Sequence, residues 1–278
     1  MSQISGAGVV ITGAASGLGR GLAQRLSGMG ARVALWDLDA AGLARAAADI
    51  RERTGSDPHA AVVDVSDPDA VRRAATEAQA ARGPIDILVN NAGVVSGRAL
   101  VDLTDAQITR TLAVNTLALF WTTRALLPDM IRRGRGHIVT IASAAGFVGA
   151  HRLTDYTASK HAAVGFDDAL RAELRRTAPS LVTTVVCPFY IDTGMLAGAK
   201  TRLPWLLPIL KEDQVVERIA RAIQRDQRRV LMPFIVRLVP LLRILPVRWF
   251  DLLADVFGLN ASMDDFTGRR GPTSFTSS

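Results

Sequence analysis

The feature that most constrains the fold is a regular alternation of two kinds of segment over the first 190 residues. Short β-branched runs are typical of strands, and Ala-rich stretches with helical spacing lie between them. Because most of the runs are apolar throughout, they indicate strands buried on both faces. The alternation predicts an α/β fold: a doubly wound parallel sheet of about seven strands with helices on both faces. The expected strands are Gly8–Thr12, Arg32–Trp36, Ala60–Val63, Ile85–Val89, His137–Ile141, Leu181–Cys187 and Arg228–Phe234, and the expected helices are Gly19–Met29, Ala40–Thr54, Asp67–Ala81, Thr104–Arg132 and Thr154–Arg176.

A glycine-rich turn joins the first predicted strand to the first predicted helix. Residues 8–22 read GVVITGAASGLGRGL, with Gly13, Gly17 and Gly19 in the spacing G-x-x-x-G-x-G. Such glycines allow a tight turn and a close approach of the backbone to a pyrophosphate, which the helix N-terminus favours. The alternative interpretation is an ordinary strand-to-helix turn without a ligand.

Acidic and small polar residues follow the next strands. Asp37 ends the second strand, 18 residues after Gly19, where a carboxylate can accept a hydrogen bond from a ribose 2′-hydroxyl and would repel a 2′-phosphate. No Lys or Arg follows until Arg45, so the sequence favours NAD over NADP. A turn-forming or capping role is the alternative for Asp37. For Asp64, after the third strand, contact with an adenine and a turn cap are both open. Residues 90–93 (NNAG) suit a ligand crevice at the carboxyl end of a strand.

A third group of polar residues surrounds the fifth strand. Tyr156 and Lys160 are four residues apart in a predicted helix and so share one face, and Ser143 follows the strand before it. All three are expected to converge beside a bound nicotinamide. Hydride transfer from an alcohol needs a base for the hydroxyl proton, and a tyrosine with a pKa of about 10 is a poor base near neutrality. A Lys160 ammonium and an oxidised nicotinamide would lower that pKa, and Ser143 would hydrogen-bond the substrate oxygen.

These motifs resemble those of the short-chain dehydrogenase/reductase family over residues 8 to about 195. TGAASGLG is similar to the family's TGxxxGxG, NNAG to its NNAG, and YTASK to its YxxxK. The resemblance implies a Rossmann fold and the catalytic residues Asn115, Ser143, Tyr156 and Lys160, with Asn115 holding a water that relays protons to the lysine. The cofactor contacts that it implies are Gly13, Ser16, Gly17, Leu18, Gly19, Asp37, Asp64, Val65, Asn91, Ala92, Gly93, Tyr156, Lys160, Pro188, Ile191 and Thr193.

Three further segments are similar to the retinol and 17β-hydroxysteroid dehydrogenase branch of that family. They are LWD at 35–37, PFYIDTGM at 188–195 and MDDFTGR at 263–269. Phe189 stands where many members have glycine, whereas Ile191 and Thr193 match positions that touch the nicotinamide carboxamide. The branch acts on lipophilic alcohols. The resemblance therefore implies an NAD-dependent oxidoreductase of the CH–OH group of a steroid-, retinoid- or long-chain-like alcohol or carbonyl compound, working as a homodimer or homotetramer.

Two alternative functions remain open. One is an NADPH-dependent 3-oxoacyl-type reductase, against which Asp37 argues. The other is a non-catalytic dinucleotide-binding or scaffold protein, which would not need the four catalytic residues.

The composition of the chain argues against several kinds of site and against a membrane-spanning segment. The single cysteine, Cys187, excludes an internal disulfide and a thiolate metal cluster, and no metal site is predicted. No apolar run reaches about 18 residues, and the N-terminus lacks the features of a signal peptide or anchor. We therefore expect a cytoplasmic protein, with a peripheral membrane contact as an open alternative, and no nucleic-acid partner is predicted.

The net charge of +7 is concentrated near the C-terminus. Residues 200–250 hold eleven Lys and Arg and four acids, which accounts for the whole excess. Apolar runs there are interrupted by single arginines at 237, 243 and 248, and prolines at 240 and 246 break any long helix.

We expect one domain in three parts. Residues 1–195 are the predicted dinucleotide-binding and catalytic core. Residues 194–257 look helical, and residues 196–265 are predicted to be the substrate lid and C-terminal helices of the same domain. Within them, residues 203–257 are predicted to form a lid, a subunit contact or a weak peripheral membrane contact. Residues 266–278 are predicted to be a disordered tail.

Overall fold

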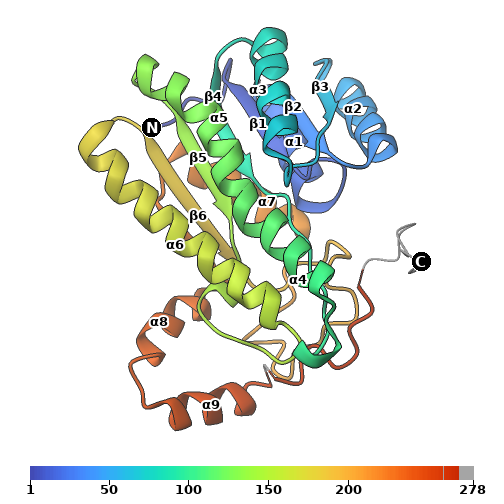
Figure 1. Ribbon diagram of the computed structural model, residues 1–278, viewed down its shortest axis with the longest axis vertical. Coiled ribbons are helices and arrows are strands. Elements are labelled where there is room, and N and C mark those ends of the chain that lie inside the picture. The colour runs from blue at the N-terminus through green and yellow to red at the C-terminus, as the bar shows by residue number, and fades with distance from the viewer. Residues whose placement is uncertain (259, 269–278) are drawn as a thin grey trace.

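Seven parallel strands form one sheet, in the order β3-β2-β1-β4-β5-β6-β7, in a computed structural model of the chain (Figure 1). The structure describes residues 1–258 and 260–268. Every neighbouring pair of strands is parallel, which confirms the predicted fold class. The strands are β1 Gly8–Thr12, β2 Arg32–Asp37, β3 His59–Val62, β4 Ile85–Asn90, β5 His137–Ile141, β6 Val182–Pro188 and β7 Arg229–Met232.

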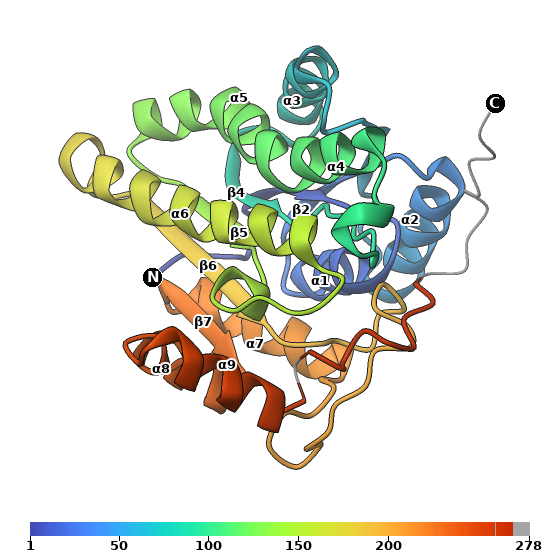
Figure 2. The same ribbon diagram turned by 60° about the horizontal axis from the view of Figure 1, so that its bottom comes forward.

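Helices cover both faces of the sheet (Figures 1 and 2). Successive strand residues point to opposite faces, so Val9 and Ile11 pack with α1, α2 and α7, whereas Val10 packs with α3, α5 and α6. Both faces are apolar, and this explains why the strands read as continuous apolar runs. The helices are α1 Gly17–Gly28, α2 Ala40–Thr54, α3 Pro68–Arg82, α4 Asp105–Leu112, α5 Ala118–Arg133, α6 Thr154–Thr177, α7 Glu212–Gln224, α8 Val239–Leu242 and α9 Val247–Val256. No helix in the described part of the chain is long and apolar enough to cross a bilayer.

The order of the strands reverses at β1. β2 and β3 lie on one side of it, and β4 to β7 lie on the other. In such sheets a ligand binds in the crevice outside the carboxyl ends of the strands, at the point of reversal. The loops after β1, β4, β5 and β6 all lie at this edge.

The helix predicted for Thr104–Arg132 is broken in the middle. Thr104 caps α4 with its side chain, and Gln107 completes a capping box. Residues Ala113–Leu117 then form a π-helical turn before α5 begins at Ala118. π-helical turns of this kind frequently mark functional sites, and this one contains Asn115.

The prediction of helix for residues 194–211 is wrong. Gly194 and Gly198 adopt positive φ angles of 77° and 87°, and Pro204 and Pro208 interrupt the apolar run that follows. Proline removes a backbone donor and cannot continue a helix. The segment is therefore a series of turns, joined to the strand end by a bridge between Ile191 and Leu210.

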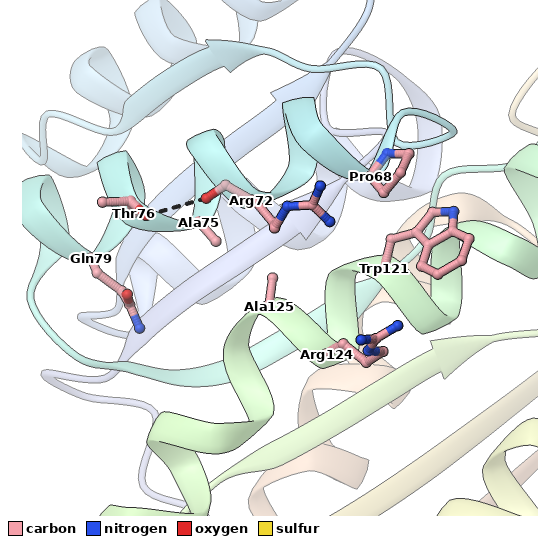
Figure 3. Close-up of a pocket in the computed structure, with 8 residues that line it drawn as sticks. All are labelled: Pro68, Arg72, Ala75, Thr76, Gln79, Trp121, Arg124 and Ala125. Atoms are coloured by element: carbon pink, nitrogen blue, oxygen red, sulfur yellow. Dashed lines mark hydrogen bonds between the residues drawn. The ribbon is translucent and has the colours of Figure 1, made fainter.

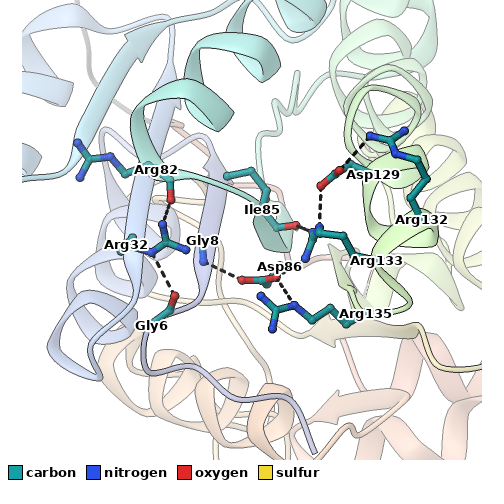
Figure 4. Close-up of polar contacts among 10 residues, drawn as sticks. All are labelled: Gly6, Gly8, Arg32, Arg82, Ile85, Asp86, Asp129, Arg132, Arg133 and Arg135. Carbon is teal, nitrogen blue, oxygen red and sulfur yellow. Dashed lines mark hydrogen bonds and ion pairs between the residues drawn. The ribbon is translucent and has the colours of Figure 1, made fainter.

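A cluster of ion pairs holds the opposite edge of the sheet (Figure 4). The carboxylate of Asp86, at the start of β4, accepts hydrogen bonds from the backbone of Gly8 in β1 and from Arg133 at the end of α5. Arg135 also contacts Asp86, and Arg133 binds Asp129 as well. The side chains of Asp86 and Arg133 are only 13% and 20% exposed, so solvent screens their attraction weakly.

Asp86→Asn should lower the free energy of unfolding by about 2 kcal/mol, because it removes one of the two carboxylates that pair with the partly buried Arg133. Urea denaturation at neutral pH measures this loss. The matched control is Asp69→Asn, whose partner Arg72 is exposed and whose loss should cost less than about 0.5 kcal/mol. Equal losses in the two variants would contradict the structural role of Asp86.

Candidate active site

The glycine turn after β1 is shaped to receive a ligand close to its backbone. Gly13 has a φ of +66°, and a Cβ there would lie 2.9 Å from Cα of Ala92. A Cβ on Gly19 would collide with the carbonyl oxygen of Gly13. The first turn of α1, which begins at Gly17, holds no acidic residue. Its N-terminal amides therefore face the crevice without a competing carboxylate, which suits an anionic pyrophosphate.

The NNAG segment after β4 braces this turn. Asn91 donates from Nδ2 to the carbonyl oxygens of Thr12 and Gly13, at 2.9 and 3.2 Å. The hydroxyl oxygen of Thr12 accepts hydrogen bonds from the backbone amides of Asn91 and Ala92, both at 2.9 Å. The end of β1 is thus locked to the end of β4, directly beneath the crevice.

Asp37 lies beside the same turn, at the end of β2. Its Oδ2 accepts a hydrogen bond from the backbone amide of Ala15 at 3.0 Å, and its Oδ1 accepts one from Asp39. Asp64 behaves differently, because its Oδ1 accepts hydrogen bonds from the amide and the hydroxyl of Ser66. Of the two interpretations of Asp64, the turn cap is therefore present in the structure.

Tyr156 and Ser143 meet at the end of β5. Tyr156 lies in the first turn of α6 and is 6% exposed. Its hydroxyl is within hydrogen-bonding reach of the Ser143 side chain. Ser143 in turn accepts a hydrogen bond from the amide of Ala145 and donates one to the carbonyl of Pro188 at 3.4 Å. The loop after β5 and the end of β6 therefore fix the position of Ser143.

Lys160 follows Tyr156 by one helical turn and is also buried. Its Nζ donates to the carbonyl oxygen of Ile141 at 3.0 Å and lies 5.6 Å from the centre of the Tyr156 ring. Asn115 approaches from the π-helical turn, where it accepts a hydrogen bond from the amide of Val94 and donates to Ser159. A Cβ on Gly93 would contact both Asn115 and Lys160, so these two side chains border the same glycine.

Burial controls the ionisation of the two central residues. It raises the pKa of Tyr156 to about 12, even though the hydrogen bond with Ser143 acts in the opposite direction. Burial likewise lowers the pKa of Lys160 to about 8. Without a cofactor, burial therefore dominates the pKa of Tyr156, and its lowering by Lys160 together with an oxidised nicotinamide stays a prediction. A phenolate at this position needs an additional positive charge nearby.

The segment after β6 carries three more of the predicted contacts. Pro188 ends β6, and its carbonyl holds Ser143. Ile191 packs against the core formed by β1 and α1, and Thr193 donates its backbone amide to the Ile191 carbonyl. This segment thus runs along the same crevice as the glycine turn and Ser143.

An apolar wall next to Tyr156 was missed by the sequence analysis as a part of the site. Tyr156 packs in one cluster with Leu153, Tyr190 and Met263, which come from three different segments. Met263 is completely buried, and the hydroxyl of Tyr190 lies 2.7 Å from that of Ser262. The similarity of the MDDFTGR segment to a family branch drew attention to these residues, but only the fold places them beside Tyr156. Val95, Ala145, Ala150, Phe189, Leu196 and Phe266 pack around the wall.

Asp155 is a second residue that the sequence analysis missed. It is 5% exposed, and its Oδ2 accepts hydrogen bonds from the hydroxyls of Ser96 and Thr111, both at 2.8 Å. It thus ties the start of α6 to α4 and to the loop after β4. The only signal in the sequence is an acid directly before Tyr156.

A surface groove between α3 and α5 contains none of the predicted site residues (Figure 3). Arg72 on its rim pairs with Asp69, and Thr76 donates to the Arg72 carbonyl. The groove is therefore separate from the site around Tyr156. It is lined by Pro68, Arg72, Ala75, Thr76, Gln79, Trp121, Arg124 and Ala125.

Comparison with known sequences settles the family. The short chain dehydrogenase profile matches residues 7–203. The chain belongs to the short-chain dehydrogenase/reductase family. It is 39% identical over 273 residues to epidermal retinol dehydrogenase 2 of Mus musculus, covering 98% of this chain and 88% of that protein. It is 40% identical over 253 residues to estradiol 17-beta-dehydrogenase 11 of Homo sapiens, covering 90% of this chain and 83% of that protein.

Solved structures of family members have the same fold. A short-chain dehydrogenase/reductase from Burkholderia phymatum in complex with NAD superposes with a TM-score of 0.80 at 28% identity, over 88% of this chain and 95% of that one. An actinorhodin polyketide ketoreductase with NADPH superposes with a TM-score of 0.75 at 29% identity, over 83% of this chain and 97% of that one. The chain is therefore an oxidoreductase with a nucleotide-binding Rossmann fold, and its structural neighbours bind NAD or NADP.

Gly19→Ala should weaken binding of NADH by at least about tenfold, because the added methyl meets the backbone of Gly13 and forces the turn apart. NADH fluorescence titration measures the affinity. Gly165→Ala is the control, since a Cβ there meets no heavy atom of the described residues within 4 Å. Unchanged binding in Gly19→Ala would show that the turn does not hold the cofactor.

Proposed function

We propose that the protein is an NAD-dependent oxidoreductase of lipophilic secondary alcohols and the matching ketones, with Tyr156 as the general acid and base. One observation carries this proposal: Tyr156 interacts with the Ser143 side chain and is itself part of the apolar wall. A substrate bound there has a polar partner for its oxygen and an apolar surface for its carbon skeleton. The names of the relatives, a retinol and an estradiol dehydrogenase, support the same substrate class.

The role of each catalytic residue follows from its contacts. The nicotinamide, when bound, accepts the hydride from the alcohol carbon or supplies it to a carbonyl. Tyr156 takes the hydroxyl proton in oxidation and returns it in reduction. Ser143 would donate its single hydroxyl hydrogen to the substrate oxygen in place of the 3.4 Å bond to the Pro188 carbonyl, while the bond from the amide of Ala145 keeps the side chain in position.

Lys160 and Asn115 support the proton transfer by Tyr156. The ammonium of Lys160 lies on the same helical face as the phenol and favours its ionised form. It is buried, so its charge acts through little water. Asn115 is held by Val94 and Ser159 beside Gly93, where a water that links it to Lys160 would carry the proton away from the site.

The residues around the crevice also fit NAD better than NADP. Asp37 is half-buried beside the glycine turn, and a 2′-phosphate near its carboxylate would meet a repulsive charge. This argues against the alternative of an NADPH-dependent 3-oxoacyl-type reductase. The alternative of a non-catalytic scaffold leaves the convergence of Ser143, Tyr156 and Lys160 without a purpose. The remaining cofactor contacts, the homodimer or homotetramer and the cytoplasmic location stay predictions.

Tyr156→Phe should reduce kcat for alcohol oxidation about 10²- to 10⁴-fold, because general acid–base catalysis is lost. Binding of NADH should survive, since the phenol contributes little to cofactor affinity. Lys160→Ala should reduce both turnover and cofactor binding. Tyr190→Phe, which removes the hydroxyl of the other tyrosine but keeps its ring in the apolar wall, is the control and should change kcat far less than Tyr156→Phe. Full activity of Tyr156→Phe would exclude the proposed mechanism.

Asp37→Ala should relax the preference for NAD, mainly by lowering the KM for NADP. Asp37→Asn should do the same while keeping an oxygen that can accept the hydrogen bond from Ala15. The ratio of kcat/KM for NAD to that for NADP should fall at least about tenfold in both variants. Asp39→Asn, a change of charge two residues later at a helix cap that asparagine also fills, is the control. Wild-type protein that already prefers NADPH would overturn the assignment of Asp37.

A further inference from the structure

Asp155 is a buried carboxylate to which the proposed mechanism gives no role. It lies in the first turn of α6, directly before Tyr156, and is only 5% exposed. Within residues 1–258 and 260–268 it forms no ion pair, and its Oδ1 atom is buried without a hydrogen-bond partner. Burying a carboxylate without a cation costs free energy. The position of Asp155 therefore needs an explanation beyond the stability of the fold.

Two hydroxyl groups hold Asp155 in place. Its Oδ2 atom accepts hydrogen bonds from Oγ of Ser96 and from Oγ1 of Thr111, both at 2.8 Å. Ser96 lies in the loop after β4, three residues after Gly93, and Thr111 lies in the last turn of α4, four residues before Asn115. The helix α4 itself lies beside α6 (Figures 1 and 2). One carboxylate oxygen therefore joins the start of α6 to two other segments of the site.

The same three parts of the chain also meet at Asn115. Its Oδ1 atom accepts a hydrogen bond from the amide of Val94 at 2.8 Å, and its Nδ2 atom donates one to Oγ of Ser159 at 3.0 Å. The hydroxyl of Ser159 in turn donates to the backbone carbonyl of Tyr156 at 2.7 Å. The first turn of α6 is therefore attached to the segments around Asn115 twice, once through Ser159 and once through Asp155.

The second attachment matters for the direction in which Tyr156 points. Hydrogen bonds have preferred lengths and angles, so two of them at different points fix the rotation of a helical turn as well as its position. A turn that is held only through Ser159 could pivot about that contact. A reacting group that is misplaced by about 1 Å can lower a rate about 10²-fold. The contacts of Asp155 are therefore in a position to affect the proton transfer.

A simpler role for Asp155 is electrostatic. An acidic residue in the first turn of a helix stabilises that helix through the helix dipole. This role needs the negative charge but no particular partner. The contacts with Ser96 and Thr111 instead need one oxygen that accepts two hydrogen bonds, which the amide oxygen of asparagine also provides. Asparagine at this position therefore separates the two roles.

We propose that Asp155 is a positioning residue for the reaction. It holds the first turn of α6 against Ser96 and Thr111, and so keeps the hydroxyl of Tyr156 in place relative to Asn115. It acts through the backbone that it shares with Tyr156. This inference rests on the proposed function, because it assigns Asp155 to the proton transfer between Tyr156 and an alcohol.

Steady-state kinetics with NAD⁺ and retinol, estradiol or cyclohexanol test this inference. Asp155→Ala should lower kcat and kcat/KM for the alcohol together, at least about tenfold, which is typical of a loss confined to the transition state. The KM for NAD⁺ should stay within about twofold of the wild-type value, since Asp155 makes no contact with the glycine turn. Asp155→Asn should keep kcat within about threefold of wild type, because its amide oxygen can accept both hydrogen bonds.

Three further variants separate positioning from a loss of stability. Ser96→Ala and Thr111→Val each remove one of the two hydrogen bonds, and each should lower kcat by less than Asp155→Ala does. They also keep the test open if Asp155→Ala does not fold. Asp86→Asn is the control, because it removes a poorly exposed carboxylate at the opposite edge of the sheet. It should leave kcat unchanged well below its unfolding temperature.

Amide hydrogen exchange gives a readout that needs no substrate. Residues 94–98 and the first turn of α6 should exchange faster in Asp155→Ala than in wild type, and at the wild-type rate in Asp155→Asn. Unchanged exchange in Asp155→Ala would overturn the inference, as would equal losses of kcat in Asp155→Ala and Asp155→Asn. An active wild type with unchanged kcat in Asp155→Ala would contradict this inference alone. A wild type that oxidises none of the three alcohols would contradict the proposed function as well.

Discussion

The whole site depends on the lock between the ends of β1 and β4. Asn91 and Thr12 join the two strand ends through four hydrogen bonds, all between 2.9 and 3.2 Å. This lock fixes the glycine turn at the point where the strand order reverses. Because all strands are parallel, the loops that carry Ser143 and Pro188 end at the same edge. The positions of the cofactor crevice and of the catalytic residues therefore follow from the parallel sheet and from the contact between the ends of β1 and β4.

Burial shifts the pKa values of the catalytic residues Tyr156 and Lys160 and so limits the formation of their charged forms. The same packing that orients Tyr156 and Lys160 makes both charged forms costly. The protein alone therefore holds Tyr156 as a neutral phenol. A positively charged cofactor, when bound, would stabilise the phenolate form of Tyr156, so that Tyr156 would act as a base only in that complex. The apolar wall makes the surroundings of Tyr156 less polar and so strengthens the interaction between these charges.

The sequence was sufficient to predict the sheet, its direction and the residues that converge at its carboxyl edge. The spacing and the types of residues within single segments are enough for these predictions. Examples are the apolar run of β5 and the four-residue spacing of Tyr156 and Lys160. Three features were not predictable in this way. The π-helical turn at Asn115 interrupts a segment with good helical spacing, and Gly194 and Gly198 outweigh the apolar character of the residues after them. The wall of Leu153, Tyr190 and Met263 joins residues that are distant in the sequence, so only the fold brings them together.

The central claim is that the bound cofactor converts Tyr156 from a buried phenol into a base, and its most direct test is a titration. The chain has two tyrosines, so Tyr190→Phe leaves Tyr156 as the only source of tyrosinate absorbance. The account predicts no tyrosinate below about pH 10 in the free protein, where burial holds the pKa of Tyr156 at about 12. With saturating NAD⁺, tyrosinate should appear well below about pH 10. A titration of Tyr156 that NAD⁺ leaves unchanged would contradict the account.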